Sequence, residues 1–574
     1  MEFREDSEVS QLVNQFEKEV PETEETQRRL EKEFRIIKEK GFAECYKQVH
    51  SIIQLTKSKG IPHILRGSAA CSLVAYFLGI HDINPLEHNI PLERFLNWTR
   101  NDHPDFDIDY PYNVRDNIIE KLQSMYPGRV ARISNRVMYR EKSALRQACR
   151  DYGHTGRLPR WFDLSNIFPD PQVRQRVRKR AKDLEGTQRM WMLHCGGIVI
   201  FDDHIPPDLL LDAKENQIAA DKKDVKDNDW IKIDILSNRG LAQLNELDDR
   251  KINKYPRDDE LASKILCEGK NIGLTQAESR TMRRALLAIQ PERMEEVALA
   301  LALIRPAAAA GGRKFSFLKD YNSGDKNRDR DSIIFDEDAI KFIAEASGCS
   351  YSQADRYRNG FSNSDGEIID EFINLIEWNK NRQEIVEELY NLQKYGFAKG
   401  HALAYGQMVW ALAYHKARDP KAFWKSTLKH CHSSYQKWIH KREAINSGVK
   451  LHNSTNGMSL RQFKKSGWWD SEDFLPEMGV KEKGDKTWFK GVFGDFRKHY
   501  SYGETSVLGV IGVGNGEYED LVISDDYPDG YYPVIEGWGR RREKLNYSHI
   551  DVKEFHCSKI KLSSHMPNRN QFFW

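Results

Sequence analysis

The run at residues 103–110, His-Pro-Asp-Phe-Asp-Ile-Asp-Tyr, has a carboxylate at every second position with apolar or aromatic residues between. Because the side chains of a β-strand alternate between its two faces, this period predicts a strand with Asp105, Asp107 and Asp109 on one face. Such crowding is costly unless divalent cations neutralise it, and oxygen ligands suit Mg²⁺ completed by water and phosphate. The run predicts a two-metal phosphoryl-transfer site. The alternative is a solvated edge strand or a helix N-cap cluster.

The length and composition describe a multidomain globular chain. With 574 residues, 39% hydrophobic and 30% charged, there is room for three or four domains, and no stretch approaches the length of a membrane span. The polar, acidic N-terminus argues against a secretory signal, so we expect a cytoplasmic protein. The eight cysteines include no CxxC pair, which favours reduced thiols over disulfides or a zinc site.

Positive charge is concentrated in residues 171–182 (PQVRQRVRKRAK), which contain no acidic side chain although the whole chain has a net charge of only +2. Such a segment can neutralise several phosphates. The alternative is a solvated helix face. Its candidate DNA-binding residues are Arg174, Arg178 and Lys182.

Residues 65–76 begin with small side chains and continue into an apolar segment that predicts a helix. Small side chains let a phosphate approach the backbone, and a helix N-terminus offers oriented N–H groups. Gly67 and Ser68 are therefore candidates for phosphate binding. An ordinary helix start is the alternative.

These segments resemble the palm of the bacterial C-family DNA polymerases, the DNA polymerase III alpha subunit family. The resemblance is carried, in the same order and spacing, by residues 66–76, 92–97 and 104–110. It implies a palm of the polymerase-beta-like nucleotidyltransferase type. It also implies that the turn at Gly67 and Ser68 holds the incoming triphosphate, and that Asp107 and Asp109 bind metal.

Two further segments extend the resemblance. Residues 230–236 are similar to the family strand that carries the third catalytic aspartate, here Asp234, with Lys232 on the same face and near enough to meet phosphate. Residues 139–150 fit a basic helix of the family, whose side chains four residues apart share one face. The resemblance favours contacts to triphosphate or primer–template over a solvated stripe. The basic residues are Lys142, Arg146 and Arg150.

Five downstream segments resemble the family's fingers: 272–283, 302–306, 335–340, 353–358 and 395–405. Their basic residues are candidate contacts to nucleotide or template, with ordinary helix-surface charge as the alternative. The candidates are Arg280 and Arg283 for nucleotide, Lys399 and His401 for DNA, and Arg305.

The expected fold class is α+β and multidomain: a polymerase-beta-like palm, a helical thumb, helical fingers and a small C-terminal OB-like β-barrel. Short apolar runs separated by turns predict the barrel strands. The expected boundaries are an acidic leader at 1–25, palm at 26–135 and 189–240, thumb at 136–188, fingers at 241–445, a reduced linker or duplex-binding region at 446–486, and the barrel at 487–574.

The chain departs from the family pattern at three places. The family's PHP metal domain is not expected, because the palm pattern starts almost at Met1, and the duplex-binding and clamp-binding region is reduced to residues 446–486. The family's Arg-Pro-Gly-Pro reads Arg305-Pro306-Ala307-Ala308, and its Gly-Ser-Gly-Ala-Gly-Ser reads Gly67-Ser68-Ala69-Ala70-Cys71-Ser72. Alanine restricts conformations that glycine allows, so loop geometry is expected to differ.

The resemblance implies a DNA-directed DNA polymerase that adds dNTPs to a primer 3′-OH and releases pyrophosphate. Two Mg²⁺ ions, or Mn²⁺, are expected at Asp107, Asp109 and Asp234. The expected partners are primer–template DNA, dNTPs and an unidentified processivity partner, without a membrane, in the nucleoid. No proofreading is expected. The alternatives are a template-independent nucleotidyltransferase and a catalytically idle DNA-binding accessory protein.

Overall fold

The computed structural model describes residues 11–558 apart from 100–101, 160, 213–214, 306–317, 319–332, 391–395, 431–438, 441–442, 445–446, 450–478, 502–503, 515–516, 524–533 and 545–546. Its contacts divide the chain into two units. Unit 1 comprises residues 1–115 and 237–574, and unit 2 comprises residues 116–236. Within the described residues, no helix has the length and apolar character that a membrane span requires.

Two amphipathic helices begin the regular structure of unit 1. Helix α2 spans Glu24–Glu39 and helix α3 spans Ala43–Lys57. The described part of the predicted leader is fastened to the rest of unit 1. Leu12 is fully buried, and the Lys18 ammonium donates to the His81 carbonyl at 2.8 Å. Apolar side chains among the acidic ones therefore anchor this segment.

Most of the acidic run forms strand β2 (Phe106–Pro111), as predicted, but Asp105 precedes the strand. It pairs antiparallel with β1 (Ile64–Arg66), with Arg66 opposite Asp107. The apolar members of the run, Phe106, Ile108 and Tyr110, are fully buried. The alternation seen in the sequence thus sets which side chains of β2 enter the core.

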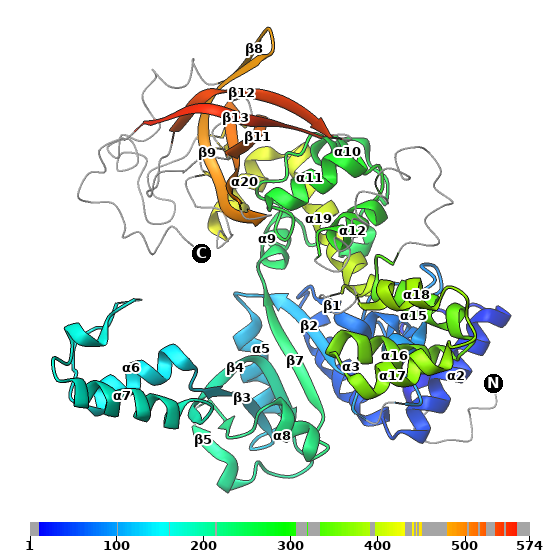
Figure 1. Cartoon of the computed structure of the whole chain (residues 1–574). Helices are drawn as coiled ribbons and strands as arrows, with labels where there is room; N and C mark the ends of the chain where they lie inside the picture. Colours follow the sequence, from blue (N-terminus) through cyan, green and yellow to red (C-terminus); the bar gives the residue numbers. More distant parts are fainter. Residues whose placement is uncertain are drawn as a thin grey trace. The chain divides into compact units, whose positions relative to one another are not determined.

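Helices make up most of the rest of unit 1 (Figure 1). One group comprises α9 (Arg239–Leu247), α10 (Glu260–Cys267), α11 (Arg280–Ile289), α12 (Met294–Leu303), α19 (Lys399–Arg418) and α20 (Pro420–Lys429). A second group has its own apolar core and comprises α15 (Asp336–Ser347), α16 (Tyr351–Asn363), α17 (Gly366–Leu375) and α18 (Arg382–Tyr390). Helix α19 is the longest described helix and is buried over most of its surface.

The C-terminal part of unit 1 is a sheet of long strands. They are β8 (Gly479–Lys483), β9 (Lys486–Ser501), β10 (Glu504–Gly514), β11 (Glu517–Ile523), β12 (Val534–Lys544) and β13 (Tyr547–Ser558). The pairings β9–β10, β10–β11, β11–β13, β13–β12 and β12–β9 close a circuit of five strands, and β8 pairs with β9 outside it. Only the β11–β13 pair among them is parallel. The first of these strands begins at Gly479, where residues 479–490 form the hairpin β8–β9. This position lies inside region 446–486, which was expected to be a linker.

Unit 2 is built on a mixed sheet and a helical hairpin. The strands β3 (Val130–Met138), β4 (Gln188–Ile200), β5 (Leu210–Asp212), β6 (Gln217–Ile218) and β7 (Lys232–Asn238) follow the order β7-β4-β3-β6-β5. Helix α5 (Arg115–Met125) precedes β3, and helix α8 (Lys222–Asp227) precedes β7. Strand β7 continues past the end of unit 2, so its last two residues belong to unit 1.

The hairpin of unit 2 consists of α6 (Glu141–Asp151) and α7 (Pro171–Leu184), which lie side by side (Figure 1). Its small core contains Ala148, Cys149, Leu164 and Val177. The other faces of α7 carry the basic side chains and are exposed. Apolar side chains on one face are therefore sufficient to join the two helices, which leaves the charged face in solvent.

Candidate active site

The carboxylates of β2 share one face, as the alternation predicts. The Arg66 Nε lies 3.6 Å from Asp109 Oδ1 and 4.0 Å from Asp107 Oδ2. Carboxylate oxygens of Asp105 and Asp107 lie within 4.8 Å of one another. Asp107 is partly exposed, whereas Asp109 is only 2% exposed. One guanidinium therefore faces two carboxylates at this strand.

Asp109 is held by two neutral hydrogen-bond donors. The Tyr405 hydroxyl donates to Asp109 Oδ2 at 2.7 Å, and the Asn238 amide donates to the same oxygen at 2.8 Å. Burial raises the pKa of Asp109 above its usual value, although Arg66, Tyr405 and Asn238 act in the opposite direction. We call Arg66, Asp107, Asp109, Asn238 and Tyr405 the acid-strand cluster.

The glycine of the predicted phosphate turn lies directly against this cluster. Gly67 has a φ of +77°, and a Cβ there would lie 3.3 Å from Asp107 Oδ2. Its N–H donates to His401 Nδ1 at 3.2 Å. Burial, together with Arg66 and Arg305, lowers the pKa of His401 to about 3, so the ring is neutral and can accept this bond. A side chain at position 67 is disfavoured by both conformation and space.

The expectation that a helix N-terminus presents free N–H groups here is wrong. Residues 67–71 form a short 3₁₀ helix, and the following α4 (Leu73–Phe77) is a single turn. The N–H groups of Leu73 and Val74 donate to the Glu33 carboxylate at 2.7 and 3.0 Å. A buried side chain of α2 therefore already satisfies the first N–H groups of α4.

Asp234 lies on β7 in unit 2, where it pairs with Gly197 of β4. The Lys232 ammonium donates to Asp234 Oδ2 at 2.7 Å, and His194 Nδ1 is 3.7 Å from Oδ1. Oδ1 is buried and has no hydrogen-bond partner in the described structure. His194 Nδ1 instead accepts from the N–H of Gly197 at 2.6 Å, consistent with a structural histidine. Asp234 therefore keeps one carboxylate oxygen available.

The basic residues predicted to contact nucleic acid lie on the hairpin of unit 2 and differ in how they are held. The Lys142 ammonium lies 3.9 Å from the Trp161 ring centroid, and Arg146 donates to the Pro159 carbonyl at 2.8 Å. Arg174 donates to two backbone carbonyls at 2.9 and 2.6 Å, so it fastens the start of α7. The exposed members of the set are Lys142, Arg150, Arg178 and Lys182.

Two of the five candidates from the fingers-like segments are buried, and the other three are partly buried. Arg280 is 7% and Arg283 is 8% exposed, and Arg280 donates to the Leu521 carbonyl of β11 at 3.4 Å. Lys399 begins α19, and its backbone N–H donates to the Glu337 carboxylate at 2.8 Å. The guanidinium of Arg305 lies 4.2 Å from the Phe397 ring centroid. Of these candidates, His401 is the one that contacts the Gly67 turn.

A second group of charges joins the segment after α4 to the helices α15 and α16. Arg94 donates to Asp336 Oδ2 at 2.8 Å, and Arg358 donates to Asp355 Oδ1 at 2.9 Å. The Asn97 amide donates to Asp355 Oδ2 at 3.1 Å. Although burial acts against it, Arg94 and Arg358 hold the pKa of Asp336 below its usual value. We call these five residues the paired-ion cluster.

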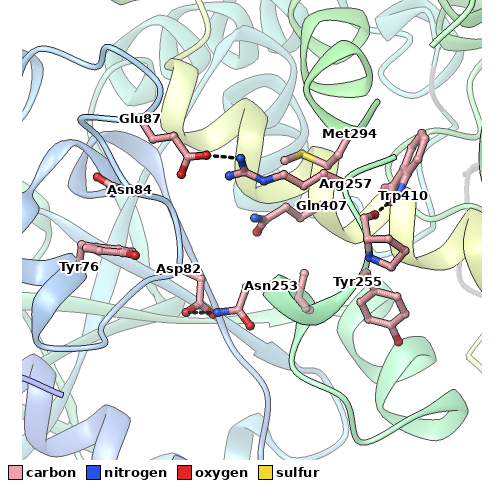
Figure 2. Close-up of a pocket in the computed structure, with 12 residues that line it drawn as sticks. Tyr76, Asp82, Asn84, Glu87, Asn253, Tyr255, Arg257, Met294, Gln407 and Trp410 are labelled. Atoms are coloured by element: carbon pink, nitrogen blue, oxygen red, sulfur yellow. Dashed lines mark hydrogen bonds and ion pairs between the residues drawn. The ribbon is translucent and has the colours of Figure 1, made fainter. Parts of the chain in front are cut away.

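A polar cavity of about 190 Å³ lies elsewhere in unit 1 (Figure 2). Gln407 and Trp410 of α19 are among the residues that line it. Asn253 donates to Asp82 at 2.8 Å, and Arg257 pairs with Glu87. Figure 2 shows both bonds as dashed lines among the residues that line the cavity. No residue of the predicted site lines it.

Three residues of the acid-strand cluster, Arg66, Asn238 and Tyr405, were not predicted as site residues, although the last two have a local signal. Tyr405 follows His401 by four residues on α19, which places both on one helix face. Asn238 follows Asp234 by four residues on β7, and its side chain caps α9 by accepting from the Leu241 N–H. Spacing within a helix or a strand indicates which of its residues share a face. The partner of each side chain is distant in sequence.

Comparison with known proteins gives matches along most of the chain. Residues 6–237 match the family model of the bacterial DNA polymerase III alpha NTPase domain, and residues 238–383 match that of the bacterial DNA polymerase III alpha subunit finger domain. The two matches adjoin. Together they include every residue of the acid-strand cluster except Tyr405, which lies on α19.

Curated relatives agree with these family models. The DNA polymerase III subunit alpha of Thermotoga maritima is 27% identical over 74% of this chain and 49% of its own length. The error-prone DNA polymerase of Idiomarina loihiensis is 26% identical over 69% of this chain and 43% of its own length. The chain spans less than half the length of these relatives. It belongs to the bacterial DNA polymerase III alpha subunit family, the C-family DNA polymerases.

Proposed function

We propose that this chain is a DNA-directed DNA polymerase that transfers dNMP to a primer 3′-OH. The observation that carries the proposal is the contact between two segments about forty residues apart: the backbone of Gly67 lies against the Asp107 carboxylate. A phosphate-accessible turn beside a carboxylate strand is what nucleotidyl transfer requires, because triphosphate and metal must share one place. Family membership supports the same reaction.

We propose that Asp107, Asp109 and Asp234 hold two divalent cations. Their oxygen-only donor set suits Mg²⁺, and the partnerless buried Oδ1 of Asp234 is an acceptor that a cation would satisfy. Family membership supports the grouping of Asp234 with the two carboxylates of β2. Bound Mg²⁺ would supply a lowered pKa for the primer hydroxyl and charge neutralisation for the leaving pyrophosphate.

The chain's own residues have distinct parts in this proposal. Arg66 presents a cation beside both β2 carboxylates, within reach of triphosphate oxygens that approach the Gly67 turn. The neutral His401 accepts from the Gly67 N–H and so holds the turn in its left-handed conformation. Lys232 donates to Asp234 Oδ2 and leaves Oδ1 as the free oxygen. Positioning of preformed charges is the main contribution.

The domain roles are part of the proposal. We assign the β1–β2 region and the sheet of unit 2 to the palm, the α6–α7 hairpin to the thumb, and the helices of unit 1 beyond β7 to the fingers. The closed circuit of five strands with one parallel pair supports an OB-like barrel. Exposed Arg178 and Lys182 would grip duplex phosphates without reading sequence.

Primer extension tests this function directly. A labelled primer is annealed to four templates that differ only in the next base, and each receives Mg²⁺ and one dNTP at a time. We expect one addition, of the complementary nucleotide only. The variant Asp107→Asn should be inactive. The matched control Asp116→Asn changes an exposed aspartate of α5 and should retain activity.

The rival functions give different patterns in the same assay. A template-independent nucleotidyltransferase would add every dNTP with equal efficiency, including to a single-stranded primer. A DNA-binding accessory protein would shift the labelled duplex in a gel without extending it. Either pattern would overturn the proposed polymerase activity.

A further inference from the structure

Asp109 offers its two carboxylate oxygens to different surroundings. Oδ2 accepts both donors, from Tyr405 and from Asn238, whereas Oδ1 faces the guanidinium of Arg66 at 3.6 Å. Two short hydrogen bonds on one oxygen fix the rotation of the carboxylate plane. The geometry therefore leaves Oδ1, rather than Oδ2, for a further ligand.

Both donors are themselves held in place. The Asn238 side chain is 3% exposed, and its own oxygen accepts from the Leu241 N–H at 3.1 Å, so the amide cannot rotate without uncapping α9. The Tyr405 side chain is 5% exposed, and its ring centroid lies 4.6 Å from that of His401. Rigid donors of this kind orient a metal ligand in other metalloproteins.

The charge of the donors matters as much as their position. Tyrosine and asparagine donate hydrogen bonds without adding positive charge, so they fix Asp109 without adding to the charge that Arg66 already places 3.6 Å from Oδ1. An arginine or lysine at either place would compete with metal for the same carboxylate. The two donors are therefore suited to orientation rather than to charge compensation.

We propose that Tyr405 is a positioning residue that sets Asp109 to bind metal through Oδ1 alone. Because Tyr405 and His401 lie on one face of α19, and His401 contacts the Gly67 turn, the same helix would align the metal ligand and the triphosphate turn. This inference rests on the proposed metal site and adds to it the residue that controls how one ligand is presented.

Removal of the Tyr405 hydroxyl tests this proposal. Tyr405→Phe keeps the ring, and Tyr414→Phe is the matched control, because it removes a hydroxyl from the same helix at a position beside Arg418. Mn²⁺ binding to the full chain is measured by loss of the free-ion electron paramagnetic resonance signal. We expect Tyr405→Phe to weaken binding by about 10-fold or more, with no change in the control.

A second measurement separates positioning from folding. Circular dichroism melting identifies a temperature at which both variants are folded, and Mg²⁺ titrations of primer extension are made there. Tyr405→Phe should need about 10-fold more Mg²⁺ for half-maximal rate and recover most of that rate at saturation. Mn²⁺ affinity equal to wild type would overturn the inference, as would a rate that excess Mg²⁺ does not restore.

Failure of the proposed function gives a different result. If neither wild type nor Tyr414→Phe extends primers while Tyr405→Phe still binds Mn²⁺ more weakly, the polymerase proposal is wrong and the positioning role stands. If wild type extends primers and Tyr405→Phe binds Mn²⁺ normally, the positioning role is wrong and the polymerase proposal stands.

Discussion

The acid-strand cluster and the paired-ion cluster both join residues more than 200 positions apart in unit 1, but they treat charge differently. In the paired-ion cluster each carboxylate accepts a short bond from an arginine: Arg94 bonds Asp336 and Arg358 bonds Asp355, while Arg358 also lies 3.9 Å from Asp336. In the acid-strand cluster one arginine approaches two carboxylates without a short bond to either, and the short bonds to Asp109 come from neutral donors.

This difference separates a structural role from a chemical one. A carboxylate bonded to its own arginine is already neutralised, and its main effect is to hold α15 and α16 to the segment that follows α4. A carboxylate oriented by neutral donors retains its charge, which costs stability unless a cation is bound. The comparison predicts that substitutions in the two clusters have opposite consequences for activity and stability.

The largest expected effect is on activity, at Asp109. Asp109→Asn should reduce the rate of primer extension by about 10³-fold or more, because an amide is a poor ligand for a divalent cation. The free energy of unfolding should change little, since an asparagine oxygen can still accept from Tyr405. Single-turnover extension and urea denaturation measure the two quantities. Loss of folding without a specific loss of rate would show that Asp109 has a structural role instead of a chemical one.

The next effect is on stability, at Arg358. Arg358→Met leaves the fully buried Asp355 without its arginine and should reduce the free energy of unfolding by about 3–5 kcal/mol. The control is Arg356→Met on the same helix, whose pair with Glu371 is 39% and 47% exposed and should contribute under about 1 kcal/mol. Equal losses in urea denaturation would contradict the distinction between buried and exposed pairs.

A smaller, pH-dependent effect is expected at Glu337, beside the paired-ion cluster. Burial and the charge of Asp336 raise the pKa of Glu337 to about 7. The folded chain therefore binds one more proton than the unfolded chain between about pH 4.5 and 7, so this group's contribution falls across that window by about 3 kcal/mol as pH rises. Glu337→Gln should remove this part of the pH dependence in denaturation. A slope unchanged by the substitution would refute it.

The smallest effect concerns exposed cations, which belong to neither cluster. Replacing Arg178 and Lys182 by Ala should reduce the salt dependence of primer–template binding by roughly one unit of slope per lost phosphate contact. Arg174→Ala should instead lower the melting temperature, because its guanidinium bonds the carbonyls of Phe168 and Pro169. Fluorescence anisotropy at several salt concentrations measures the slope. An unaltered slope would assign α7 an ordinary solvated face.

The sequence predicted those features that depend on neighbours along the chain. The period of two in residues 103–110 predicted β2 and its buried face. Asp234 lies in an unremarkable Lys-x-Asp, so its identification depended on family resemblance rather than on spacing.

Features that depend on distant contacts could not be predicted in the same way. The Tyr405 hydroxyl reaches Asp109 across 296 residues, and no local pattern encodes that distance. Glu33 fills the N-terminus of α4 from about forty residues upstream, which made the expected phosphate position at that helix wrong. The parallel pairing of β11 with β13 likewise follows from closure of the five-strand circuit.

The central claim is that β2 and Asp234 form one metal-binding unit. A double-mutant cycle of Asp107→Asn and Asp234→Asn, measured as single-turnover primer extension at saturating DNA, tests it most directly. The account predicts that each single variant loses about as much rate as the double variant, because each ligand is needed to hold the ions. Losses that simply multiply, or an Asp234→Asn variant that extends primers near the wild-type rate, would contradict it.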